Sequence, residues 1–379
     1  MRPRFPIALV VGLVLLAPAA AQPPAGKADA GNAAMKYWQA FGLLPTMTKE
    51  QEKIVHEWDK APLDAAALKL IEQAGNSLEY LHRGARLSHC DWALDYEDGI
   101  NLLIPHLSKA RTLAQLAALR ARHKFAQGQT KVGLDDVTAL FKLARHVEAD
   151  PLMIDQLVGF AIEGMAIQSA APYLPDTKTG LPELAATLDR LPAGPTFTQM
   201  LQIEKRTSAD WLIRELRAAE KNKAGSWQDV WKQLLGGPSE AGAPAPKVPA
   251  AKTLDEAVKM LEDLPPLYEE VAKLTELPWA EFNPRYATFI EKAQAANPAA
   301  AAIFPAMNHV VAAKRRADAR MALFRAAVAI VQGGPDKVKE TKDPFGDGPF
   351  GYTARDNGFE LTSKLTFKEQ PVTLVVGKK

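Results

Sequence analysis

The sequence predicts a mainly α-helical protein, in which antiparallel helical hairpins pack in a bundle or an irregular solenoid and a small β-hairpin or sheet lies at the C-terminus. Apolar residues recur at helical spacing through most of the chain, and short joints containing Pro, Gly or Asp separate the helical segments. Asn357-Gly358 lies between two strand-like segments, as in a β-hairpin. With 47% hydrophobic and 24% charged residues among 379, the composition is that of a globular protein.

The first 21 residues have the pattern of a secretory signal peptide. Arg2 and Arg4 precede an apolar run over residues 7–17, and small residues follow up to Ala21. This run is shorter than the roughly 20 residues that a membrane-spanning helix needs. We therefore expect cleavage after Ala21, no transmembrane anchor in the mature chain, and export to the periplasm or the extracellular space.

The charge balance of the mature chain excludes a function that depends on a strong net charge. Without Arg2 and Arg4, the 46 basic residues are reduced to the same number as the 44 acidic ones. Nucleic-acid binding therefore has no electrostatic support. Cys90 is the only cysteine, so no intramolecular disulfide is expected.

A helical domain is predicted over residues 33–236, after a flexible leader over residues 22–32 that is rich in Ala, Pro and Gly. The helices expected in its first part lie near residues 33–44, 49–60, 64–86, 102–127, 134–149 and 152–173. A further helical stretch runs from Thr196 to about Gly236. The short joints between these helices predict antiparallel neighbours.

The helix over residues 102–127 has the clearest pattern, because one stripe of it is apolar and rich in alanine. The members of this stripe are Leu103, Leu107, Ala110, Ala114, Ala117, Ala121 and Phe125. Small side chains let a second helix approach closely, so we expect a central packing helix. Asp135 and Asp136 are expected at the start of the next helix, where the positive end of the helix dipole favours carboxylates.

The helix that follows Asp150 is apolar on nearly every side and is therefore predicted to be buried, yet it carries Glu163. The preceding helix has Lys142, Arg145 and His146 on its polar side, and the turn near Asp150 brings the two helices together. A buried carboxylate needs a partner. Two interpretations stay open: a structural ion pair, or a binding or acid/base site formed by Glu163, Arg145 and His146.

The rest of the chain divides into a linker, a second helical segment and a small β-rich module. The linker covers residues 237–252, where prolines and alanines prevent a continuous helix, and the second helical segment covers residues 253–334. The helices expected in this second segment lie at residues 254–277, 284–296 and 298–332. The β-rich module covers residues 335–379, and its expected strands lie at residues 350–355, 358–363 and 371–376. The basic residues of the last helix, which we interpret as a solvated face or as a surface for an acidic partner, are Lys314, Arg315, Arg316, Arg320 and Arg325.

Cys90 is the other candidate for chemistry, since it lies between His89 and Asp91. A thiol next to a base and a carboxylate has the residue types of nucleophilic catalysis, but the apolar residues that follow favour a small buried hydrophobic residue at Cys90. His56 begins a zinc-protease pattern, but Lys60 occupies the position of the second histidine. We expect neither a metal nor a cofactor.

Several short phrases resemble uncharacterised exported helical proteins that planctomycete-type bacteria carry in many copies. The phrases are Cys90-Asp91-Trp92, Leu143-Ala144-Arg145-His146, Leu157-Val158-Gly159-Phe160-Ala161-Ile162, Asp343-Pro344-Phe345-Gly346 and Gly358-Phe359-Glu360-Leu361. The last two are also similar to the ends of type II secretion pseudopilins, although this chain lacks the N-terminal assembly helix of those proteins. The resemblance implies export and a helical architecture, and it assigns no catalytic residue.

Three functions are consistent with these observations. The first is a helical binding or scaffold protein of the cell envelope, with an envelope protein as a possible partner. The second is an envelope hydrolase, which needs His146 and Glu163, or Cys90 with a histidine, to line an open pocket. The third is a component of a secretion or surface assembly.

Overall fold

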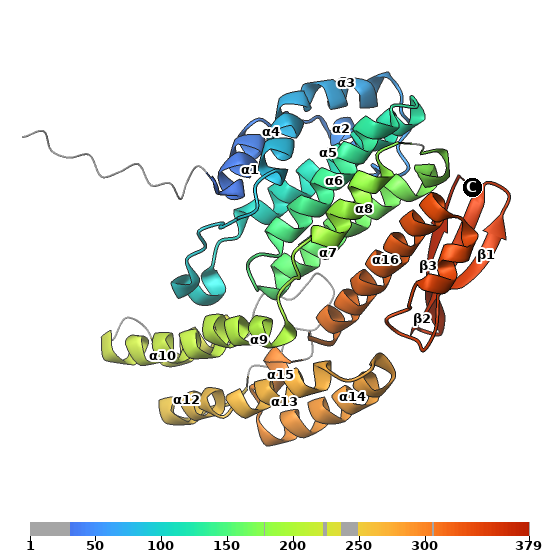
Figure 1. The fold of residues 1–379 in the computed structure, drawn as a ribbon. Helices are drawn as coiled ribbons and strands as arrows, with labels where there is room; N and C mark the ends of the chain where they lie inside the picture. Colours follow the sequence, from blue (N-terminus) through green and yellow to red (C-terminus); the bar gives the residue numbers. More distant parts are fainter. Residues whose placement is uncertain (1–30, 178, 223–225, 236–248, 305–306, 379) are drawn as a thin grey trace, which may run out of the picture.

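The computed structural model describes residues 31–177, 179–222, 226–235, 249–304 and 307–378 (Figure 1). It is mainly helical with a small antiparallel sheet at the C-terminus, which confirms the predicted fold class. The predicted signal peptide (residues 1–21), most of the leader (22–32) and most of the linker (237–252) lie outside the described residues. No helix in the described part of the chain combines the length and the apolar character needed to cross a membrane.

The N-terminal part is a set of packed helices built around α5, α6 and α7, which contact one another side by side (Figure 1). Its helices are α1 (Ala33–Gly42), α2 (Lys49–His56), α3 (Ala65–Gln73), α4 (Gly75–Ala85), α5 (Pro105–Ala126), α6 (Thr130–Val147) and α7 (Met153–Ala170). Short turns join α5 to α6 and α6 to α7, so these helices form the antiparallel hairpins that the joints predicted.

Two expectations for this part are wrong in detail. The single helix expected over residues 64–86 is divided between α3 and α4 at Ala74, next to Gly75, a poor helix former. Leu103 is 76% exposed, because α5 begins only at Pro105, a residue that suits the first turn of a helix. The buried stripe of α5 therefore starts at Leu107.

The middle of the chain forms a second group of shorter helices. They are α8 (Leu181–Arg190), α9 (Phe197–Lys205), α10 (Trp211–Asn222), α11 (Trp227–Leu235), α12 (Leu254–Glu262), α13 (Pro265–Thr275), α14 (Trp279–Ala296) and α15 (Ala300–Ile303), with a π-helical turn between α9 and α10. The helix expected over residues 254–277 is interrupted before Pro265, which begins α13. Conversely, α14 continues through Pro284 and starts at Trp279, one turn earlier than expected.

Helix α8 was not expected from the sequence. Leu181, Leu184 and Leu188 form its buried face, and Gly180 precedes it with a φ of 87°, a backbone conformation that glycine adopts without strain. Helix α8 packs against α6 and α16, and it leads into the segment that forms one edge of the candidate site.

Helix α16 (Met307–Gly333) belongs to both hydrophobic clusters of the molecule. Its start contributes Met307 and Val311 to the cluster formed with α9–α14, and its remainder contributes residues such as Phe324 and Ile330 to the cluster of the N-terminal helices and the sheet. Figure 1 shows α16 between the sheet and the N-terminal helices, in agreement with its contacts to α7, α8, β2 and β3.

The basic residues of α16 form a solvated face only in part, since Arg316 and Arg320 are exposed whereas Arg315 and Arg325 bond main-chain oxygens. Arg315 donates to the main-chain oxygens of Thr275 and Leu277 at 2.7 and 3.1 Å, where α13 ends. Arg325 donates to the oxygen of Leu188, near the end of α8. Guanidinium groups at these positions satisfy the free carbonyls of the helix ends and interact favourably with the helix dipoles.

The C-terminal sheet has the order β1-β2-β3, with all neighbours antiparallel. Its strands are β1 (Gly351–Arg355), β2 (Gly358–Phe367) and β3 (Gln370–Val376). The predicted hairpin is confirmed, since Arg355 pairs with Gly358 across Asp356-Asn357. The sheet packs on α16 and contributes to the main hydrophobic core. A sheet of so few strands has little stability by itself, and this packing supplies it.

Candidate functional site

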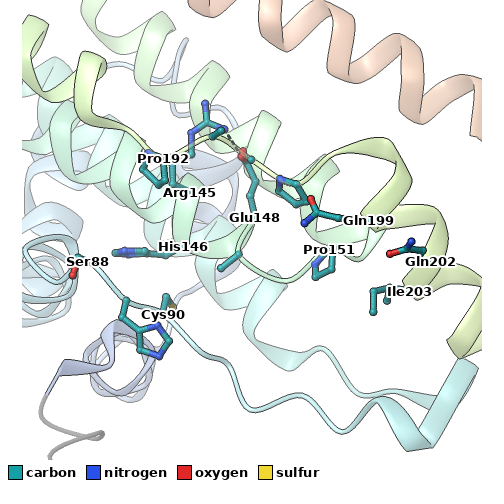
Figure 2. A pocket seen from close by; sticks show the side chains of 15 residues that line it. Ser88, Cys90, Arg145, His146, Glu148, Pro151, Pro192, Gln199, Gln202 and Ile203 are labelled. Atoms are coloured by element: carbon teal, nitrogen blue, oxygen red, sulfur yellow. Dashed lines mark hydrogen bonds and ion pairs between the residues drawn. The ribbon is translucent and has the colours of Figure 1, made fainter. Parts of the chain in front are cut away.

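Four short segments, of which the last two are consecutive in the sequence, surround a pocket of about 500 Å³ (Figure 2). They are residues 88–90 in the loop after α4, residues 145–149 at the end of α6 together with Pro151, residues 192–195 between α8 and α9, and the face of α9 with Gln199, Gln202 and Ile203. The pocket brings together three of the predicted site residues, Cys90, Arg145 and His146, whereas Glu163 lies behind its wall.

Arg145 is the centre of a buried charged network. Its Nη2 atom lies 2.6 Å from Glu163 Oε1, and its Nη1 atom donates to Glu148 Oε2. Glu148 and Glu163 are only 1% and 3% exposed. The predicted contact between Glu163 and Arg145 is thus present, and a second carboxyl, Glu148, shares the same guanidinium.

The two carboxyls compete for a single guanidinium. Burial and the neighbouring Glu148 raise the pKa of Glu163 to about 8, and burial also raises the pKa of Glu148. The charge of Arg145 can balance only one carboxylate, so one proton is retained on the pair at neutral pH. We place it on Glu163, since Glu148 accepts the better aligned hydrogen bond from Arg145.

Helix α16 adds a second ion pair to this network. Lys314 lies 2.9 Å from Asp318, one turn further along the helix. The charges of both residues act on the pKa of Glu163 and of Glu148. The two carboxyls therefore lie within the electrostatic influence of α16, which packs against α7.

Two glycines leave the space that the Glu148 side chain occupies. A Cβ atom on Gly159 of α7 would lie 2.3 Å from Glu148 Cγ, and one on Gly194 would lie 3.2 Å from Glu148 Oε2. Gln156 fixes the turn between α6 and α7, since its Nε2 donates to the main-chain oxygens of Glu148 and Asp150 at 2.9 and 3.0 Å. The carboxyl is thus held in a narrow slot between α7 and the segment 192–195.

His146 is held from two sides in a neutral state. Its Nδ1 atom lies 2.6 Å from the Tyr37 hydroxyl, and its main-chain oxygen accepts a 2.8 Å hydrogen bond from Trp92 Nε1. Burial, with a smaller contribution from Lys142, lowers the pKa of His146 to about 4. The imidazole on the pocket wall is therefore uncharged at neutral pH.

The Cys90 thiol is 9% exposed at the edge of the same pocket. Burial, assisted by the charge of Asp150, raises the pKa of the thiol well above its usual range. A thiolate is the reactive species of a nucleophilic cysteine. Cys90 and His146 consequently lie in one pocket as a neutral thiol and a neutral imidazole.

We expect Cys90 in the native protein to react slowly with a thiol reagent at pH 7, and to react rapidly only after unfolding in urea. The raised pKa and the burial of the sulfur both reduce the reaction rate. Mass spectrometry of time-quenched samples measures the rate. Cys90→Ala should cost only about 1 kcal/mol of stability, because it leaves a small cavity. Rapid labelling of the folded protein below pH 7 would contradict this prediction.

Sequence reasoning missed Glu148 and the environment of Asp136. Glu148 directly follows the last residue of α6, a position that does not by itself indicate burial. Because α6 begins at Thr130, Asp136 lies inside the helix rather than at its start, and it is fully buried. Its carboxylate accepts a 2.9 Å hydrogen bond from Arg120 Nε and lies 2.7 Å from His82 Nε2. The helical spacing could have indicated the burial of Asp136, since this residue falls on the same apolar face as Val137 and Leu140.

No protein-family model, curated protein or solved structure matches the chain. Within the described residues, no group of three or more His, Cys, Asp or Glu side chains could hold a metal ion. The chemistry of the site is therefore inferred from its own geometry.

Proposed function

We propose that the protein is an exported binding protein of the cell envelope, and that it holds its ligand in the pocket beside Arg145 and Glu148. The signal-peptide pattern of residues 1–21 supports export. The observation that carries the binding function is the position of the buried charged network, directly in the wall of a pocket lined by three distant parts of the chain.

Burying charged groups in a protein core costs desolvation free energy. Replacing such a network with apolar residues is often neutral or stabilising, so its presence calls for another reason than stability. Here the network fixes the polar groups of a concave surface in one arrangement. Rigid placement of a few polar groups in a cleft is the usual property of ligand-binding sites.

Binding is favoured over hydrolysis by the protonation states of the candidate catalytic groups. A cysteine hydrolase needs a thiolate next to a histidine that accepts and returns a proton. In this pocket burial raises the pKa of Cys90 and lowers the pKa of His146 to about 4, so the proton stays on the thiol and no thiolate forms at neutral pH. Glu163, whose pKa is suited to proton transfer near neutral pH, is 3% exposed and does not line the pocket.

A fragment screen by ligand-observed NMR tests the proposal, with Ala193→Trp as the blocking variant. Ala193 is exposed and lines the pocket, so a tryptophan there fills the cavity without entering a core. We expect fragments that bind the wild type to lose at least tenfold in affinity for this variant. Ala66→Trp, on the exposed face of α3 and outside the pocket, is the matched control and should bind as the wild type does. The proposal fails if no fragment binds, or if Ala193→Trp binds equally well.

A further inference from the structure

We infer that the pocket takes a short, uncharged peptide segment in an extended conformation. This inference rests on the proposed binding function and adds the chemical class of the ligand. It is carried by the main-chain groups along the rim, by two primary amides on α9 and by the absence of net charge on the ionisable groups of the wall.

The rim segment over residues 192–195 offers free main-chain groups to a ligand. Among the described residues, none forms a hydrogen bond with the main-chain N–H or C=O groups of this segment. Pro192 and Pro195 restrict φ to about −65°, and the flanking Leu191 and Thr196 have ψ values of 130° and 158°. The segment is therefore an extended strip with N–H donors at Ala193 and Gly194 and a carbonyl acceptor on every residue.

A second segment, residues 88–90, lies on another side of the pocket and is held by hydrogen bonds to the start of α1. His89 forms an isolated parallel bridge with Asn32, and its main-chain oxygen accepts a 2.8 Å hydrogen bond from Ala33 N. The Asn32 side chain also bonds both main-chain groups of Asp91, at 2.8 and 3.0 Å. This side of the pocket therefore needs little ordering when a ligand binds, which reduces the entropic cost of binding.

Gln199 and Gln202 add side-chain amide donors and acceptors on the opposite side of the pocket. They lie one turn apart on the exposed side of α9, and Figure 2 shows them across the pocket from Ser88 and Cys90. The oxygen of Gln199 accepts from the Thr196 main chain at 2.8 Å, so its amide nitrogen is left to donate. A primary amide offers the donor and acceptor that match a peptide group.

The charges of the wall favour an uncharged ligand over an ionic one. Arg145 is neutralised by Glu148, and the pKa of about 4 keeps His146 uncharged. Apart from the exposed His89, the described residues of the wall offer a charged ligand no unpaired opposite charge, and such a ligand would lose its hydration. The cavity of about 500 Å³ lies within the range of small-ligand pockets, so only a short segment fits.

The test measures the affinity of acetyl-tetraalanine amide by saturation-transfer NMR titration. We expect it to bind the wild type, and to bind at least tenfold more weakly when its amide nitrogens are methylated, since methylation removes the N–H donors. Maltose, a neutral ligand rich in hydroxyl groups, should bind at least tenfold more weakly than the peptide.

Ala193→Pro provides the matched change in the protein. It deletes one main-chain donor of the rim in a segment already bounded by prolines, and its urea-unfolding midpoint shows whether the fold is kept. We expect a three- to tenfold loss of affinity for the unmethylated peptide only. Equal binding of the methylated peptide, tighter binding of maltose, or no peptide binding in a protein whose fragment hits are blocked by Ala193→Trp would each overturn the inference while leaving the binding function intact. If no fragment binds either, both fall.

Discussion

Replacing Arg145 with methionine is expected to destabilise the protein by about 3–5 kcal/mol at pH 7, the range found when one partner of a buried ion pair is removed. The substitution keeps most of the side-chain volume but leaves Glu148 and Glu163 buried without their cation. Urea denaturation followed by tryptophan fluorescence measures the loss.

Two comparisons make this result specific to the buried network. Arg214→Met removes an exposed guanidinium that pairs with Glu97 at 3.1 Å, and such surface pairs contribute at most about 1 kcal/mol. The triple variant Arg145→Met, Glu148→Gln, Glu163→Gln removes the uncompensated carboxyls and should recover part of the loss. If Arg145→Met costs no more than Arg214→Met, the network has no energetic importance.

Glu163→Gln is expected to gain stability relative to the wild type as the pH rises from about 4.5 to about 8. The pKa of Glu163 is raised from 4.5 to about 8 in the folded protein, so the folded state binds more protons than the unfolded state throughout this interval. Stability from this group is therefore fully present below pH 4.5 and is lost as the pH approaches 8. The full difference is on the order of 5 kcal/mol, and glutamine, which does not titrate, avoids it.

Urea midpoints of both proteins at intervals between pH 4 and pH 9 test this prediction. The titration of His146 is common to both proteins and cancels in the difference. Glu97→Gln is an informative control with the opposite sign, because Arg206 and Arg214 lower the pKa of Glu97. The relative stability of this variant should fall only as the pH rises towards 4.5 and should stay constant from there to pH 9. A pH-independent difference between Glu163→Gln and the wild type would show that Glu163 is ionised in the folded protein.

The long amphipathic elements were predictable because their pattern is local. The alanine stripe of α5, the apolar helix α7 and the hairpin at Asn357-Gly358 each carry their signal within a few turns or residues. Boundaries were less predictable, since the start of α5 at Pro105 and the break at Ala74 depend on where the chain turns to reach its neighbours. Helix α8 was missed because it is short.

The candidate site was predictable only where two adjacent helices form it. The pairing of Glu163 with Arg145 follows from one antiparallel turn, which sequence spacing can represent. The segment 192–195 and the face of α9 join the site through tertiary packing, so their role could not be inferred from position in the chain. The slot for Glu148 likewise depends on Gly159 and Gly194, which come from two different elements.

The position of α16 has a thermodynamic consequence for the whole molecule. Val311 is part of one hydrophobic cluster and Phe324 of the other, on the same continuous helix. Loss of α16 would expose apolar surface on both clusters at once, so neither cluster has an intact core without it. We therefore expect the unfolding free energies of the two clusters to be coupled through this helix, so that a local weakness in either cluster lowers the stability of the other.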